Sequence, residues 1–237
     1  MYMMKKEVKM KLSKHTIEVL KNFATINPNI VVNPGQQLKT IAEAKNILAS
    51  AEITEDFPQE FGIYDLNEFL SSVNLVGDPE LTFDDNFVKL QADASVPHKG
   101  SVKYFFSEKD ILTSPTKEVD MPDPEFSVQI EEDSLNQIRK AAAILGHNEL
   151  ALFGEDGVIT AKVLDDKDST ANVFELELER NNDCKNKFTF IVNISNLKLL
   201  PGDYYVSISS KLISHWTNSH IPVNYYIALE KGSEFHV

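Results

Sequence analysis

The chain has 237 residues, of which 42% are hydrophobic and 25% are charged, and this composition excludes a predominantly disordered protein. No run of about 18 apolar residues is present, which excludes a membrane-spanning helix, and the N-terminal residues lack the apolar region of a secretory signal. The formal net charge of −13 argues at first sight against nucleic acid as a partner.

Charge is distributed unevenly along the chain. Residues 1–14 contain five lysines and one glutamate, whereas residues 108–133 contain nine acidic residues and two lysines. Because local charge determines which surface attracts a polyanion, an acidic chain with separate basic stretches remains compatible with nucleic-acid binding.

The first half of the chain alternates between helical and strand-like periodicity. Residues 13–27 predict a helix with Ser13 as N-cap and Pro28 after its end. Its predicted apolar face carries Ile17, Leu20 and Ala24, and its opposite face carries Lys14, Glu18, Lys21 and Thr25. Strands are predicted at 30–32, 37–42, 46–53 and 61–64, a second helix at 66–75, and further strands at 81–83, 87–91 and 102–106.

Residues 107–125 have no clear period and contain three prolines, which is typical of a linker. After them the pattern predicts a strand at 126–130 and a helix from Asp133 or Ser134 to Leu145, with Gly146 as its stop. The remaining predictions are strands at 150–153, 158–164, 172–179 and 188–193, a short helical piece at 194–200, and strands at 204–209, 212–216 and 223–230.

The two halves share one order of predicted elements, which indicates an internal repeat. Leu20 and Lys21 correspond to Ile138 and Arg139 at an offset of 118, and Leu66 corresponds to Ile194 at an offset of 128. A repeat of roughly 110 residues is a whole domain. The sequence therefore predicts an α+β protein with two similar domains, the alternative being a coincidence of two α/β segments.

Motifs that carry catalytic chemistry are absent from the sequence. It contains no GxGxxG, GxxxxGK[ST], HExxH or GxSxG pattern, and its six histidines have no ligand spacing. The single cysteine, Cys184, provides neither an internal disulfide nor a four-ligand zinc site, and it favours a reducing, intracellular compartment. No constellation of residues therefore argues for an enzyme, a metal site or a cofactor, and we expect neither a metal nor a cofactor, although the motifs alone do not exclude an enzyme.

Short segments in both halves form a pattern that known proteins share. They are Met10–Lys14, Leu20–Asn27, Ile63–Asn67, Phe69-Leu70, Leu75-Val76, Phe190–Asn193, Asn196–Lys198, Pro201–Tyr204 and Tyr226–Glu230. In this order the set resembles the sliding clamps of T-even-type bacteriophages, from residue 10 to about residue 231, while the intervening strands diverge.

The resemblance implies two clamp-type domains with antiparallel sheets on the outside and helices lining a central hole, in a trimeric ring. Residues 10–106 and 126–237 would form these domains, 107–125 the connector between them, and 1–9 a flexible N-terminal extension.

The function that the resemblance implies is that of a processivity factor, which encircles duplex DNA without reading its sequence and tethers the replicative DNA polymerase. It further implies loading by an ATP-dependent clamp loader, a role in late transcription through a sigma-like partner, and a location in the cytoplasm of the infected bacterial host. No membrane partner is expected.

The predicted DNA-facing side chains are cations opposite the apolar helix faces. Sliding needs an attraction to phosphates that has no preferred direction, and a positive lining on an acidic body supplies it. Together with the family match, this selects Lys11, Lys14, Lys21, Arg139, Lys140 and Lys198. Glu18 is expected to pair with Lys14 or Lys21, and a solvated amphipathic face is the alternative for these cations.

Two further surfaces are expected from the way clamps bind partners and close. A peptide anchor needs an apolar, desolvated pocket, which we assign to Ile111, Leu112, Met121 and Phe235, the alternative being ordinary packing. Ring closure needs an edge strand from each neighbouring subunit, for which the candidates are 102–106 and 172–179. The interface residues would then be Val102, Tyr104, Val173 and Phe174.

Two other classes of protein remain open at this point. One is a non-catalytic, repeat-built phage module that binds only protein, and the other is an enzyme with a site assembled from dispersed carboxylates. A trimer retained on circular DNA favours the clamp, whereas a monomer that ignores the loader and polymerase favours the binding module. Turnover abolished by one carboxylate substitution would favour the enzyme.

Overall fold

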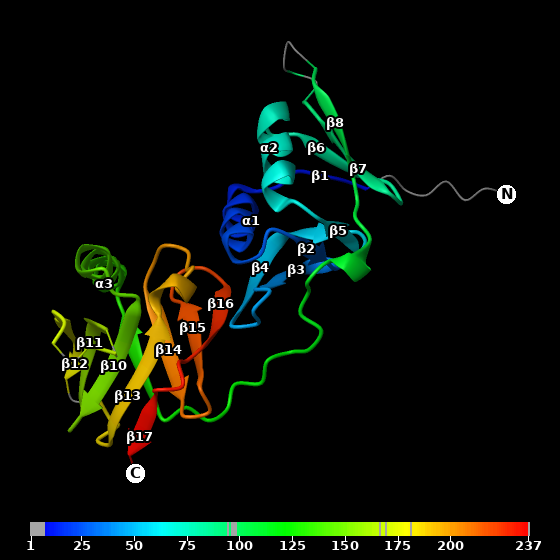
Figure 1. The fold of residues 1–237 in the computed structure, drawn as a ribbon. Coiled ribbons are helices and arrows are strands. Elements are labelled where there is room, and N and C mark those ends of the chain that lie inside the picture. The colour runs from blue at the N-terminus through cyan, green and yellow to red at the C-terminus, as the bar shows by residue number, and fades with distance from the viewer. Residues whose placement is uncertain are drawn as a thin grey trace. The chain divides into compact units, whose positions relative to one another are not determined.

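The computed structural model describes residues 8–93, 95, 99–165, 167–168, 170–180 and 182–236. These residues form two compact units, shown as a ribbon in Figure 1. The first unit contains residues up to 43 together with 50–116, and the second contains 44–49 together with the chain from 117 onward. Residues 1–7, most of the predicted flexible extension, lie outside the described residues, whereas Lys9 already belongs to the first strand.

The first half of the chain carries two helices and small antiparallel sheets. Its elements are β1 (Lys9–Met10), α1 (Lys14–Ile26), β2 (Ile30–Val32), β3 (Gly35–Ile41), β4 (Ile47–Phe57), β5 (Phe61–Ile63), α2 (Leu66–Val76), β6 (Glu80–Phe83), β7 (Phe87–Gln91) and β8 (Ser101–Phe105). One sheet has the order β1-β6-β7-β8, while β2 pairs with β5 and β3 pairs with β4. Helices α1 and α2 contact each other, and α2 lies against β7 and β8.

The 3-10 helix η1 (Lys109–Ile111) lies near the end of the first unit, and the second half of the chain begins after it. The elements that follow are β9 (Phe126–Ile130), α3 (Glu132–Leu145), β10 (Glu149–Glu155), β11 (Val158–Leu164), β12 (Phe174–Arg180), β13 (Lys187–Asn193), the 3-10 helix η2 (Ile194–Asn196), β14 (Tyr204–Ser209), β15 (Ile213–Asn218), β16 (Val223–Ala228) and β17 (Glu234–His236). In this unit β9-β14-β15-β16 and β12-β11-β10-β13-β17 follow one another in the sheets, and α3 packs on β11 and β12.

The predicted repeat is confirmed by the order of the elements. Each half has one strand, one helix, four strands, a shorter helical piece and three strands, and β17 is added at the end. Helix α1 begins at residue 14 and α3 begins at residue 132, which gives the predicted offset of 118. The piece related to α2 is only a three-residue 3-10 helix, η2.

Helix α1 keeps its predicted exposed face but buries a different stripe. Ser13 is the N-cap, and its hydroxyl oxygen accepts a hydrogen bond from the Thr16 N–H at 3.1 Å. The buried side chains are Thr16, Val19, Leu20, Phe23 and Ile26. Ile17 and Ala24, predicted for the apolar face, are only half-buried, because the stripe through Val19, Phe23 and Ile26 is the one that packs inward.

Several predicted boundaries in the second half are wrong, each for a local reason. Helix α3 begins at Glu132, before the predicted Asp133 or Ser134, because the cap is a distant side chain rather than a neighbour. The predicted helical piece at 194–200 is helical only at 194–196, since Leu197 leaves helical backbone angles at φ −77° and ψ 56°. The two-residue strand β1 and the three-residue strand β17 have no counterpart among the predicted strands.

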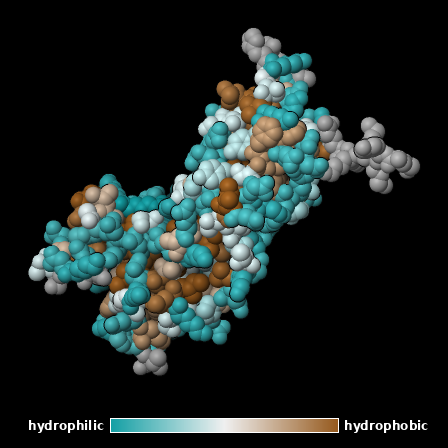
Figure 2. All heavy atoms as spheres, turned by 45° about the vertical axis from the view of Figure 1, so that its right-hand side comes forward, coloured by the Kyte–Doolittle hydropathy of each residue, from teal (hydrophilic) through white to brown (hydrophobic). Residues whose placement is uncertain are grey.

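The largest buried side chains of the second unit form two aromatic clusters. Tyr204, Trp216 and Tyr225 are fully buried, with ring centroids 6.1–6.3 Å from Tyr204. Phe126 stacks on Phe188 at 4.2 Å. None of the described helices has the length and apolar character needed to cross a membrane, and Figure 2 shows a mostly hydrophilic surface interrupted by apolar patches.

Candidate nucleic-acid interface and partner surfaces

The exposed face of α1 carries two of the predicted DNA-facing cations. Lys14 and Lys21 are both exposed, and Glu18 lies between them on the same face. No ion pair joins Glu18 to either lysine within the described residues, so the expected pair is not formed. The face therefore carries two separate positive charges and one negative charge, with nothing apolar on it.

A buried carboxylate fixes the end of α1 from which Lys14 projects. Glu55 of β4 is 8% exposed and accepts hydrogen bonds from the Thr16 hydroxyl at 2.5 Å, the Thr54 hydroxyl at 3.0 Å and the Ser13 N–H. Burial alone would raise the pKa of Glu55, but these hydrogen bonds outweigh it and hold the pKa below its ordinary value. Sequence reasoning missed this residue, although an acid among buried strand positions was the available signal.

Of the two predicted DNA-facing cations on helix α3, one is exposed to solvent and the other is hydrogen-bonded to the backbone of the segment after η2. Lys140 is exposed, whereas Arg139 is half-buried and its Nη2 donates a hydrogen bond to the Leu197 carbonyl at 3.0 Å. Lys198, half-buried, follows directly in sequence. The structure thus places Arg139 and the segment of Lys198 together, with Arg139 bound to backbone.

The N-terminus of α3 is capped from a loop far away in sequence. The Asp203 carboxylate accepts a hydrogen bond from the Glu132 N–H at 2.8 Å and lies 3.2 Å from the His220 imidazole. These contacts, the first of them most strongly, hold the pKa of Asp203 below its ordinary value. The preceding Gly202 has φ +131°, and a Cβ there would lie 2.7 Å from the Asn218 side-chain nitrogen. This conformation is open only to glycine.

Lys11 differs from the other predicted DNA-facing cations because carboxylates already surround it. Its ammonium lies 3.2 Å from Asp78 and 3.3 Å from Asp93, and these hydrogen bonds raise the pKa of Lys11. The Ser95 N–H, and then Lys11, lower the pKa of Asp93 to about 2. One lysine between two carboxylates leaves a local surplus of negative charge, which weakens any attraction of Lys11 for phosphate.

The two strands predicted to form the subunit interface are both edge strands of their sheets. β8 ends the order β1-β6-β7-β8, and β12 ends the order that continues through β11, β10, β13 and β17. Val102 of β8 is half-buried, while Val173, just before β12, is 50% exposed. Phe174, at the start of β12, helps line a groove of about 430 Å³ between β12 and α3.

Tyr104 of β8 is held against α2. Its hydroxyl donates a hydrogen bond to the Asp65 carbonyl at 3.1 Å, and its ring meets Phe69 edge-on at 5.3 Å. Burial, together with the charges of Glu68 and Asp65, raises the pKa of Tyr104 to about 12. The hydroxyl therefore stays neutral and keeps the edge strand in place.

The four residues predicted for the partner-peptide pocket have different environments. Ile111, at the end of η1, is 65% exposed. The Leu112 side chain instead packs against Gly62, and a Cβ added to Gly62 would lie only 2.6 Å from the Leu112 Cδ1. These two belong to the first unit, and Met121 and Phe235 belong to the second. Phe235 stacks with the second unit's aromatic cluster, so of the four Ile111 is the most available to a partner.

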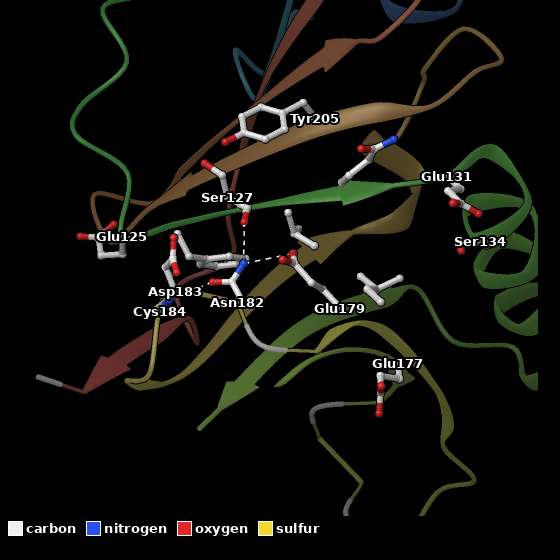
Figure 3. A pocket seen from close by; sticks show the side chains of 14 residues that line it. Glu125, Ser127, Glu131, Ser134, Glu177, Glu179, Asn182, Asp183, Cys184 and Tyr205 are labelled. Carbon is white, nitrogen blue, oxygen red and sulfur yellow. Dashed lines mark hydrogen bonds between the residues drawn. The ribbon is translucent and has the colours of Figure 1, made fainter. Parts of the chain in front are cut away.

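The second unit also contains an acidic cavity of about 760 Å³ along β9 and β12. Figure 3 shows Asn182 within it, donating hydrogen bonds to the Ser127 carbonyl at 2.9 Å and to Glu179 at 3.1 Å. Its carboxylates are Glu125, Glu131, Glu177, Glu179 and Asp183, and its described lining contains no basic side chain. Such a cavity repels phosphate groups. Among the described residues, no three His, Cys, Asp or Glu side chains are grouped so as to hold a metal.

Comparisons with family models and with known sequences all match this chain to one type of protein. Residues 11–101 match the family model described as DNA polymerase processivity factor, and residues 127–231 match the model described as the C-terminal part of the gp45 sliding clamp. The sliding clamp of Vibrio phage KVP40 is 32% identical over 226 residues, covering 93% of this chain and 99% of the relative. That of Enterobacteria phage T4 is 31% identical over 232 residues, covering 94% and 98%.

Solved structures independently support the fold. The chain matches proliferating cellular nuclear antigen from Entamoeba histolytica with a TM-score of 0.67 at 13% identity, covering 94% of this chain and 98% of that one. A chain of the PCNA2–PCNA3 complex from Sulfolobus tokodaii gives 0.66 at 12% identity, with coverage of 94% and 99%. From the repeated α+β units, the family models and the phage relatives together, we conclude that this chain belongs to the sliding clamp family of DNA polymerase processivity factors.

Proposed function

We propose that three copies of this chain assemble head to tail into a ring that encircles duplex DNA, with α1 and α3 toward the hole. The observation that carries the proposal is the placement of Lys14, Lys21 and Lys140 on exposed faces of repeat-related helices, in a chain of net charge −13. Acidic surfaces elsewhere repel DNA, so the polyanion is favoured only where these cations gather.

A ring of this kind needs only weak contacts with phosphates. Contacts between lysines and phosphates depend on salt and not on sequence. Glu18, between Lys14 and Lys21, reduces the attraction further. The expected complex is therefore mobile along DNA and held by topology rather than by affinity.

The polymerase partnership follows from the family, and the other partners are part of this proposal. We place loading by an ATP-dependent clamp loader and contact with a sigma-like factor of late transcription on the apolar surface that includes Ile111, in the cytoplasm of the infected bacterium. An exposed isoleucine suits the apolar anchor of a short peptide. Replacing Ile111 with Asp should weaken binding of a peptide from the polymerase C-terminus.

The ring is tested by retention on DNA of different topology. The chain is loaded onto nicked circular DNA with its cognate loader and ATP, and bound protein is measured before and after one restriction cut. Retention on the circle, with rapid loss after the cut, is the expected result. Equal retention on cut and uncut DNA, or a chain that stays monomeric in light scattering at all concentrations, would instead favour the protein-binding module.

A further inference from the structure

We propose that one face of the first unit's sheet binds a short acidic segment of another protein, in which an acidic side chain is followed two residues later by an aromatic one. The surface consists of Phe87, Lys89, Lys103 and Phe105, on the neighbouring strands β7 and β8 (Figure 1), and we call it the lysine–phenylalanine face. It lies within the first unit, so the inference goes beyond the proposed ring and does not depend on it.

The two lysines of this face lie directly opposite each other. Lys89 of β7 is the register partner of Lys103 of β8, and both are exposed. Tyr104 is held against α2, so the neighbouring residues of β8 project from the other side of the sheet. Among the described residues, no carboxylate forms an ion pair with either lysine. Because like charges directly opposite each other destabilise a sheet, this pair costs stability as long as no anion covers it.

Two aromatic rings stand beside the lysines on the same face. Phe87 and Phe105 are register partners with ring centroids 5.8 Å apart, and Phe105 is 61% exposed. The Lys103 ammonium lies 3.7 Å from the centroid of Phe87 and 5.2 Å from that of Phe105. These cation–π contacts hold the lysine in place without cancelling its charge. An exposed ring beside two uncompensated cations suits a partner that carries both an anion and an aromatic group.

Carboxylates on two sides of the face limit the length of the anion that it can accept. On the β1 side the next cation, Lys9, is already ion-paired with Glu80 at 2.8 Å. Beyond Phe87, the turn between β6 and β7 carries the exposed Asp84 and Asp85. A nucleic acid needs a cationic track that follows several phosphates, and here the track ends after two lysines. A peptide segment with one or two carboxylates fits within it.

The spacing on the face specifies the order of side chains in the partner. Lys103 and Phe105 are two residues apart on one strand, a distance of about 6.8 Å. In an extended peptide, side chains two residues apart also share one side. One carboxylate can therefore lie between the ammonium groups of Lys89 and Lys103 while an aromatic ring two residues further along stacks on Phe105. The carboxylate would also relieve the repulsion between the lysines.

The experiment measures binding of labelled synthetic peptides to the full chain by fluorescence anisotropy at low salt. The probe contains Glu-Thr-Phe, and two control peptides replace its Glu with Gln or its Phe with Ala. The probe should bind about threefold or more tightly than either control, and its advantage over the Gln peptide should shrink as salt is added. A peptide with Glu-Phe-Thr, which places the two groups on opposite sides, should bind no better than the controls.

Charge reversal on the protein separates binding from stability. Lys89→Glu converts the like-charge pair into a cross-strand ion pair, so it should raise Tm while weakening binding of the probe about tenfold. A peptide with Lys-Thr-Phe should bind the double variant Lys89→Glu/Lys103→Glu more tightly than it binds the wild type. Lys211→Glu, at an exposed lysine of the second unit, is the matched control and should leave binding of the probe unchanged.

The aromatic half of the face is tested by Phe105→Leu, which keeps an apolar side chain on the strand but removes the ring. Binding of the probe should fall about threefold, while the preference for Glu over Gln in the peptide should remain. Phe105→Trp, which keeps an aromatic face, should retain binding. Tyr64→Leu is the matched control, because Tyr64 is 62% exposed, and it should have no effect.

Several results would overturn the inference. Equal binding of the Glu and Gln peptides would remove the role of the lysines, and a fall in Tm for Lys89→Glu would show that the pair is structural. A single-stranded oligonucleotide bound more tightly than the probe, and lost in Lys89→Glu, would identify nucleic acid as the occupant. A change in trimer content in Lys89→Glu would identify a second copy of this chain. Retention on circular DNA tests the proposed ring separately, and neither outcome there alters these expectations.

Discussion

The carboxylate of Glu55 and the hydroxyl of Thr16 lie 2.5 Å apart, across a sequence separation of 39 residues. This contact joins strand β4 to the first turn of α1, where Lys14 begins the exposed cationic face. Ser13 completes the arrangement, because its N–H also donates to Glu55. The orientation of a surface helix is thus set by a buried charged hydrogen bond.

Replacing Glu55 with Gln should destabilise the first unit by about 1.5–3 kcal/mol, because hydrogen bonds to a buried charged acceptor are replaced by weaker or mismatched ones. Urea denaturation followed by circular dichroism gives the free energy of unfolding. Asp56→Asn is the matched control, since Asp56 is exposed on the opposite face of the same strand. Equal effects of the two changes would contradict the capping role.

The contribution of Glu55 should depend on pH with a definite sign. Its pKa is lowered from the ordinary value of 4.5 in the folded state, so the folded state favours the ionised form. The stabilisation is fully present above pH 4.5 and is lost as the pH falls through the lower folded value. The difference in Tm between wild type and Glu55→Gln should therefore be constant near neutral pH and shrink below about pH 4.5. A constant difference down to acidic pH would argue against an ionised Glu55.

Replacing Gly202 with Ala should destabilise the second unit by about 1–3 kcal/mol, because φ is positive and the new Cβ would press on Asn218. Loss of this turn would also displace Asp203 from the N-terminus of α3. Differential scanning calorimetry measures the change. Gly100→Ala is the control, since a Cβ at Gly100 has no atom within 4 Å, and it should leave Tm nearly unchanged.

Replacing Lys14 and Lys21 together with Glu should weaken DNA binding without changing assembly, since both side chains are exposed on α1. The slope of log K against log salt should fall by about 1 for each phosphate that a lysine no longer neutralises. The measurement is polymerase processivity across a salt series, with trimer content checked by light scattering. Lys187→Glu/Lys211→Glu, which reverses two exposed lysines away from α1, is the charge-matched control, and an equal decrease in processivity for that variant would remove α1 from the DNA-facing surface.

Replacing Arg139 with Gln should affect stability more than DNA binding. Its guanidinium donates a hydrogen bond to the Leu197 carbonyl, and removing a charged hydrogen bond costs about 1.5–3 kcal/mol. Hydrogen exchange of the amides at 194–198 should become faster, and Lys140→Gln should leave it unchanged. If Arg139→Gln lowers only processivity, Arg139 acts on DNA and not on the fold.

The repeat could be predicted from the sequence because it depends on local periodicity. The offset between Leu20 and Ile138 reappears as the offset between the first residues of α1 and α3. The exposed face with Lys14 and Lys21 was equally predictable, since residues spaced by a helical turn share one side whatever the helix packs against. The sliding clamp family was also recognisable, from short segments that lie in both halves.

Tertiary structure decided the roles that depend on residues distant in sequence. Thr16, which binds Glu55, and Glu132, which binds Asp203, lie 39 and 71 residues away from them in sequence, and no periodic pattern contains that information. The same holds for Lys11, which lies between Asp78 and Asp93. By itself, the sequence determined which side chains can share a face, because helix and strand geometry are local. The folded chain decided which of those charges stay exposed and which are bound, because hydrogen bonds and ion pairs form only between groups that the fold brings within about 3 Å of each other.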